Sequence, residues 1–176
     1  MSIAVVMGSN SDLAVMEPAI DVLREFAVPS FVRVVSAHRD PRGMLEFAAA
    51  ARADGAEIII AGAGGAAYLP GMIAAATTLP VNGVPVGRPH LDGLDSLLSI
   101  AQMPAGVPVV TIAIDGSHNG SLLAIRILAL GDPTLAAAIE AHRESLRDEV
   151  ASRNTGVQAL LAARDHKTTS ATDQED

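Results

Sequence analysis

Residues 3–12 read Ile3-Ala4-Val5-Val6-Met7-Gly8-Ser9-Asn10-Ser11-Asp12, an apolar run of strand length that passes directly into a turn of small polar residues. The unbroken apolar run predicts a strand buried on both faces, as in parallel sheets. Apolar residues then recur three and four positions apart from Leu13 to Phe26, which predicts an amphipathic helix. Ser11 or Asp12 is the expected cap of that helix. This stretch therefore predicts the strand, turn and helix of an α/β fold.

The alternation of strand and helix continues along the chain. Further strands are expected at 31–35, 57–61, 80–84 and 107–114, and further helices between Asp40 and Gly55 and at 69–76, 94–100, 119–130 and 133–164. Such units form a parallel sheet with helices on both faces. We expect a single domain over residues 1–164, ending in a helix long enough to reach a neighbouring subunit, and then a flexible polar tail over 165–176.

Composition limits the partners of the chain. With 12 Lys and Arg residues against 20 Asp and Glu residues, the net charge of −8 argues against nucleic-acid binding. No apolar run is long enough for a membrane span, and Met1-Ser2-Ile3 leads straight into the first strand without room for a signal peptide, so we expect a cytoplasmic protein. The absence of cysteine excludes disulfides and thiolate nucleophiles.

Three short segments each follow an expected strand. They are residues 8–12, Ser36-Ala37-His38-Arg39 and Gly62-Ala63-Gly64-Gly65-Ala66-Ala67. Because the carboxyl ends of neighbouring parallel strands meet at one edge of a sheet, we expect the three segments to gather there. Backbone N–H groups and hydroxyls in such turns bind small anions. The candidate ligand-binding residues are Ser9, Ser11, Asp12, Ser36, Arg39, Gly64, Gly65 and Ala66.

Each segment also has a simpler interpretation. The serines and the aspartate of the first turn either cradle a phosphate and a ribose or only cap a helix. The glycine-rich segment either lets the backbone approach a ligand or serves helix packing. A lone loop histidine is more often a surface residue, but the position of His38 beside Arg39 and opposite the glycines favours an acid–base role.

The other histidines do not form a metal site. His90, His118, His142 and His166 lack the spacing of metal ligands, and no His-Glu-x-x-His motif or acidic cluster occurs. We therefore expect no metal.

Further segments in a fixed order identify a known family. They are Leu69-Pro70-Gly71-Met72, Gly83-Val84-Pro85-Val86, Gly93-Leu94-Asp95-Ser96-Leu97-Leu98-Ser99-Ile100 and Gln102-Met103-Pro104-Ala105-Gly106-Val107-Pro108. Together with the three segments above, they make roughly residues 3–130 resemble the PurE family, in its class I, the N5-carboxyaminoimidazole ribonucleotide mutases of purine biosynthesis. The resemblance implies a flavodoxin-like three-layer α/β/α sandwich with a five-stranded parallel sheet. It also implies a homo-octamer with active sites where subunits meet.

The resemblance implies a reaction as well. In this family the carboxyl group of N5-carboxyaminoimidazole ribonucleotide is released as CO2, stays trapped, and is added again at C4 of aminoimidazole ribonucleotide. No metal, nucleotide or organic cofactor takes part. The matching positions make His38 the general acid–base, make Ser9, Asp12 and Arg39 ribonucleotide-binding residues, and put Ser11 and Ser36 nearby.

One position departs from the family pattern. The family usually has histidine where this chain has Tyr68, within Ala66-Ala67-Tyr68-Leu69-Pro70-Gly71. A phenol stays neutral and can donate a hydrogen bond, whereas an imidazole can also carry charge, so Tyr68 is a candidate modulator of the site. The segment that contains Asp115 and His118 also departs from the family. Two alternatives therefore stay open: a PurE-like carboxylase or decarboxylase acting on another ribonucleotide, and a non-catalytic nucleotide-binding module of flavodoxin-like fold.

Overall fold

A computed structural model describes the backbone of residues 2–172 and the side chains of residues 2–164. Its centre is a five-stranded parallel sheet in the order β2-β1-β3-β4-β5. The strands are β1 (Ser2–Met7), β2 (Ser30–Val34), β3 (Ala56–Gly64), β4 (Val81–Val86) and β5 (Val110–Thr111). The helices are η1 (Asn10–Asp12), α1 (Leu13–Glu25), α2 (Pro41–Ala50), α3 (Leu69–Ala76), α4 (Leu94–Ala101), α5 (Ser117–Ala129) and α6 (Pro133–Thr172).

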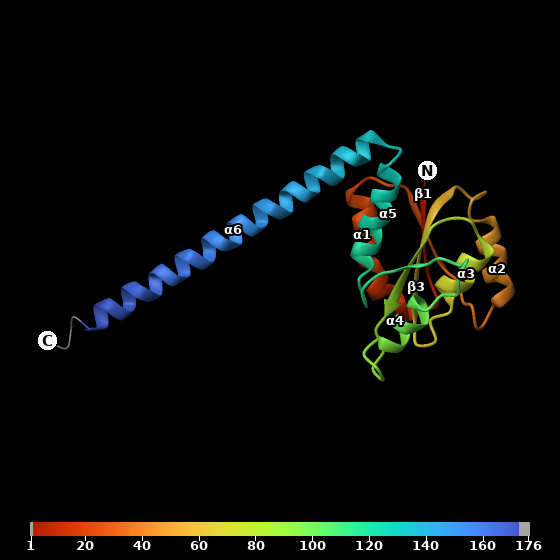
Figure 1. The fold of residues 1–176 in the computed structure, drawn as a ribbon, viewed down its shortest axis with the longest axis horizontal. Helices are drawn as coiled ribbons and strands as arrows, with labels where there is room; N and C mark the ends of the chain where they lie inside the picture. Colours follow the sequence, from red (N-terminus) through yellow and green to blue (C-terminus); the bar gives the residue numbers. More distant parts are fainter. Residues whose placement is uncertain (1, 173–176) are drawn as a thin grey trace.

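Helices cover both faces of the sheet, which confirms the predicted three-layer sandwich (Figure 1). Side chains alternate between the faces along β1, so that Ala4 and Val6 join one core and Val5 and Met7 join the other. The first core packs against α2 and α3, and the second packs against α1 and α5. Because both faces are covered, β1 is apolar at every position after Ser2.

Two strands differ from the prediction at their ends. Strand β3 runs through to Gly64, whereas the sequence led us to end it at Ala61. Gly62 pairs with Met7 on β1 and with Val84 on β4. A Cβ at this position would lie 2.4 Å from the sulfur of Met16 on α1, so glycine lets this helix pack closely on the sheet. Strand β5 has only two residues instead of the predicted 107–114. It lies at the sheet edge and follows Pro108, which has no N–H to donate to a neighbour.

The helix starts confirm one prediction and correct two. Asp40 caps α2 as expected, because its carboxylate accepts a hydrogen bond from the Gly43 N–H at 2.9 Å. Neither Ser11 nor Asp12 caps α1 with its side chain; instead Ser9 caps the short helix η1 by accepting from the Ser11 N–H at 3.3 Å. Helix α5 begins at Ser117, so the prediction of a start at Asn119 was wrong.

Helix α6 projects away from the domain (Figure 1). Its first turns pack on the second core through Leu135 and Ile139, but every side chain from Arg143 to Arg164 is exposed. The backbone stays helical to Thr172, and residues 173–176 of the expected tail lie outside the described residues. Among the residues that the structure describes, no helix is both long and apolar enough to cross a membrane.

Candidate active site

The three predicted segments meet at the carboxyl ends of β1, β2 and β3. In the strand order 2-1-3-4-5, successive connections leave β1 and β3 in opposite directions, and this switch point is where open α/β sheets bind ligands. A cleft of about 170 Å³ lies there. Its lining consists of Gly8, Ser9, Asp12, Ser36, Ala37, His38, Arg39, Ala63, Gly64, Ala66, Tyr68, Leu69 and Arg88.

Asp12 is the buried acidic group of the cleft. Only 2% of the residue is exposed, although it lies in the turn after β1. Its carboxylate oxygen Oδ1 accepts hydrogen bonds from the Ser11 hydroxyl at 3.2 Å and from the Arg88 guanidinium at 2.5 Å. A buried carboxylate is costly unless it is paired with a positive charge. Arg88 provides that charge, and Asp12 consequently acts as an ion-pair partner and not as a helix cap.

Arg88 is the site residue that the sequence analysis missed. It follows β4 by two residues and reaches across the end of β3 to Asp12, 76 positions earlier in the chain. The side chain lies flat over Gly64, where a Cβ would come within 2.4 Å of Arg88 Nε. The sequence did contain an indication of this residue, because Arg88 follows a strand of the same sheet, as the three predicted segments do.

Arg39 is the second guanidinium of the cleft and comes from the opposite side. Its Nε donates to the Ser36 hydroxyl at 3.2 Å, and its terminal NH2 donates to the Gly8 carbonyl oxygen at 3.0 Å. These contacts tie the turn after β2 to the turn after β1. The side chain is exposed and keeps further N–H donors for a ligand.

His38 lies in the same turn, between Ala37 and Arg39, and faces Tyr68 across the cleft. The two rings form an edge contact with centroids 5.1 Å apart and planes at 78°. His38 is exposed, and Tyr68, directly before α3, is 54% exposed. In a single chain the imidazole therefore touches both the cleft and solvent.

Some of the predicted residues line the cleft, and others only support the turns around it. Gly64 and Ala66 line the cleft. Gly65, in contrast, turns the chain with φ +68°, and its N–H donates to the Ser96 hydroxyl at 2.8 Å. Gly65 and Ser11 thus lie next to the lining residues without belonging to them.

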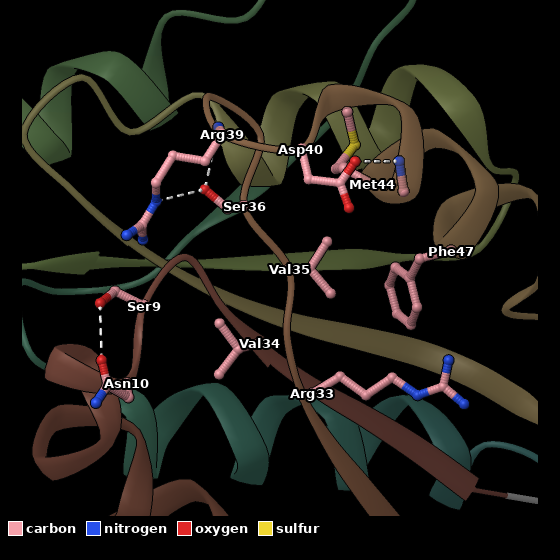
Figure 2. Close-up of a pocket in the computed structure, with 11 residues that line it drawn as sticks. Ser9, Asn10, Arg33, Val34, Val35, Ser36, Arg39, Asp40, Met44 and Phe47 are labelled. Carbon is pink, nitrogen blue, oxygen red and sulfur yellow. Dashed lines mark hydrogen bonds between the residues drawn. The ribbon is translucent and has the colours of Figure 1, made fainter.

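A larger hollow of about 470 Å³ adjoins the cleft and shares Ser9, Ser36 and Arg39 with it. Figure 2 shows this hollow beside the end of β2, with the Arg39 side chain next to Ser36 and with Ser9 nearby. The hollow continues past Val34 and Val35 to Phe47 on α2. Together, the cleft and the hollow reach the size of a small-molecule site.

The site offers acid–base and anion-binding groups. Among the described residues, no group of three or more His, Asp or Glu side chains could hold a metal ion. What the cleft contains is one imidazole, two guanidiniums, one buried carboxylate and several hydroxyls. Such a set suits a small ligand with anionic groups and hydroxyls, and a proton transfer by the imidazole.

Residues 2–149 match the model of the family described as AIR carboxylase. Over 158 residues the chain is 56% identical to the N5-carboxyaminoimidazole ribonucleotide mutase of Mycobacterium tuberculosis, covering 90% of this chain and 91% of that one. It is 53% identical over 148 residues to the phosphoribosylaminoimidazole carboxylase of Schizosaccharomyces pombe, covering 84% of this chain but only 27% of that longer protein.

The fold has a solved counterpart. The crystal structure of Treponema denticola PurE superposes with a TM-score of 0.77 at 24% sequence identity, covering 84% of this chain and 92% of that one. This likeness supports the assignment of the fold, and the sequence relatives support the assignment of the family.

Proposed function

This chain belongs to the AIR carboxylase family, and on that premise we propose that it is an N5-carboxyaminoimidazole ribonucleotide mutase of purine biosynthesis. The enzyme is an isomerase that moves a carboxyl group from the exocyclic nitrogen N5 to the ring carbon C4. The observation that carries the proposal is the 56% identity over 90% of the chain to a relative of that name. The non-catalytic module is set aside, because the named relatives are enzymes.

We assign the proton transfers to His38. In the first step the bond between N5 and the carboxyl carbon breaks, CO2 leaves, and the imidazolium of His38 gives its proton to the nitrogen. In the second step C4 attacks the retained CO2, and the neutral imidazole removes the proton from C4. One imidazole is enough for both steps, because it gives a proton in the first step, takes one back in the second and so returns to its starting state. The exposure of His38 at the cleft supports this role, because the ring can reach a bound ligand.

The substrate lies across the cleft and the larger hollow. The guanidinium of Arg39, with Ser9 and Ser36 beside it, binds the phosphate, because charge-assisted hydrogen bonds from arginine favour phosphate oxygens. The carboxylate of Asp12 accepts from the sugar hydroxyls, and Gly64 and Ala66 leave room for the imidazole ring. Ser11 and Gly65 support the turns that hold these residues.

A closed site requires more than one chain. CO2 escapes from a pocket that is open to water, and His38 and Tyr68 are exposed in the single chain. We therefore propose that neighbouring copies, in a homo-octamer, cover the cleft. Exposed apolar side chains on the outer part of α6, beyond Ile139, support an assembly, because Leu146, Val150 and Leu160 leave a face for another copy to bury. We propose the cytoplasm as the compartment.

One observation favours a second candidate function. The carboxylase of S. pombe matches this chain at 53% identity, so direct carboxylation of aminoimidazole ribonucleotide is the runner-up. An NMR assay without ATP separates the two. A mutase interconverts the N5 and C4 carboxylated isomers at a rate independent of added bicarbonate. A carboxylase forms the C4 isomer only from aminoimidazole ribonucleotide and bicarbonate, and a protein that does neither would overturn the proposal.

A further inference from the structure

We infer that Arg88 is a positioning residue of this site, which holds Asp12 so that one carboxylate oxygen is presented to the hydroxyls of the ribonucleotide. The inference rests on the proposed function, because it takes the ligand of Asp12 to be the sugar of that substrate. It assigns a role to a residue that lies outside the three polar segments of the site.

The contacts of Asp12 divide unequally between its two oxygens. Oδ1 accepts from both Arg88 and the Ser11 hydroxyl. In the described part of the chain, no hydrogen bond to Oδ2 is observed, although Asp12 lines the cleft. A carboxylate oxygen can accept two hydrogen bonds and donates none, so its partner must be a donor such as a hydroxyl. Oδ2 is thus the oxygen left for the ligand.

The backbone that leads into Arg88 is fixed by hydrogen bonds within the chain. The Gly87 N–H donates to the Asp115 carboxylate at 2.7 Å, and the Asp115 N–H donates to the Pro85 carbonyl at 2.9 Å. The Ser96 hydroxyl donates to the Val86 carbonyl at 2.8 Å, which anchors the same segment to α4. A binding group whose supports are fixed in advance does not have to be ordered when the ligand binds.

The ion pair also adjusts the charge of the cleft. An unpaired carboxylate at Asp12 would repel the phosphate and the carboxyl group of the substrate. Arg88 neutralises it at 2.5 Å and leaves Arg39 as the net positive group of the cleft. Asp12 can then contribute a hydrogen-bond acceptor without excluding an anionic ligand.

A double-mutant cycle tests whether Arg88 acts through Asp12. The dissociation constant of aminoimidazole ribonucleotide is measured for the wild type, Asp12→Asn, Arg88→Gln and the double variant, well below their melting temperatures. Each single substitution is expected to weaken binding by at least about tenfold, the scale of a hydrogen bond to a charged group. The double variant is expected to bind as weakly as Asp12→Asn alone, because the second change removes nothing further.

The exposed pair Arg24 and Asp21 provides a matched control, since their side chains are 73% and 62% exposed on α1. The corresponding single and double substitutions of Arg24 and Asp21 are expected to leave the dissociation constant of aminoimidazole ribonucleotide unchanged. Arg88→Lys, which keeps the charge, is expected to recover part of the binding lost in Arg88→Gln.

Two results would overturn the inference. Additive losses at Asp12 and Arg88 would mean that Arg88 contacts the ligand independently. A lowered melting temperature with an unchanged dissociation constant would mean that the pair serves only stability. Failure of the proposed function looks different, because the wild type itself would then fail to bind the ribonucleotide or to interconvert the isomers, and this inference would fall with it.

Discussion

The imidazole of His38 meets the phenol ring of Tyr68 edge-on, with the ring centroids 5.1 Å apart. No hydrogen bond to the His38 ring is observed within residues 2–164, and the Tyr68 ring is the aromatic group that the imidazole contacts there. Aromatic pairs of this geometry contribute about 0.5–1.5 kcal/mol beyond their burial. The contact joins the turn after β2 to the start of α3, and it makes both residues informative targets for mutation.

Replacing His38 by asparagine should abolish most turnover without harming binding. Asparagine keeps the size and polarity of the side chain but cannot shuttle a proton, so turnover is expected to fall by at least about 100-fold. The dissociation constant of aminoimidazole ribonucleotide should stay within about threefold, because the ligand's anchoring groups remain. Isomer interconversion and calorimetric binding measure the two quantities.

His118→Asn is the control for that experiment. His118 is exposed at the start of α5 and does not line the cleft, so its replacement should change neither quantity. Full turnover in His38→Asn would refute the acid–base assignment.

Three substitutions of Tyr68 distinguish the role of its ring from the role of its hydroxyl. Tyr68→Phe keeps the ring contact and should leave kcat nearly unchanged. Tyr68→Ala removes the contact and should lower kcat by about three- to tenfold, the range that corresponds to an aromatic pair. Tyr68→His, the residue usual in the family, should fold and should retain or raise mutase activity, because Tyr68 is 54% exposed and its replacement disturbs little packing. If Tyr68→Ala keeps the kcat of the wild type, the ring contact does not position His38.

Much of this site could be predicted because its residues follow strands whose burial is visible in the sequence. The apolar run before Gly8 specifies a central strand, and a parallel sheet then brings the turns after β1, β2 and β3 together. Each of these turns can be recognised from its neighbours in the sequence alone, because its own strand precedes it and its own helix follows it.

The pairing of Asp12 with Arg88 could not be predicted in the same way. The two residues are 76 positions apart, and nothing near either one indicates the other. A turn aspartate before a helix has the local signature of a cap, and the correct role appears only when β4 is placed beside β3. The length of β5 was overestimated for a related reason, because an apolar run does not reveal how many of its residues find a partner strand.

Gly64→Ala should displace the Arg88 side chain, which packs against Gly64. The new Cβ would lie 2.4 Å from Nε and 3.2 Å from Cγ of Arg88, so the side chain must move near its root and lose its contact with Asp12. We expect an unfolding free energy lower by about 1–3 kcal/mol, as for other overpacked sites, and weaker binding of aminoimidazole ribonucleotide. Thermal unfolding and calorimetry measure both.

Gly156→Ala gives the matched control, because Gly156 lies within α6 with no atom near its missing Cβ. Alanine is favoured over glycine in a helix by about 1 kcal/mol, so the melting temperature should not fall. Wild-type affinity in Gly64→Ala would show that the site tolerates a displaced Arg88.

The outer part of α6 should be required for assembly. Leu146, Val150, Val157 and Leu160 are between 48% and 66% exposed, and their spacings of four, seven and three residues put them on one face of the helix. An exposed apolar stripe of this kind marks a surface that another protein surface covers. Val150→Lys combined with Val157→Lys should therefore lower the mass of the assembly in light scattering, and should lower turnover with it if neighbouring copies close the cleft.

Ser152→Lys distinguishes a specific interface from a general effect of added charge. Ser152 lies outside that stripe, about 120° around the helix from its centre, and is exposed, so this variant should keep the mass and activity of the wild type. The domain should melt normally in all variants, because neither core includes a residue of α6 beyond Ile139. If the lysine pair leaves the assembly intact, α6 does not hold it together. If the mass falls while turnover is kept, the cleft closes without a neighbour.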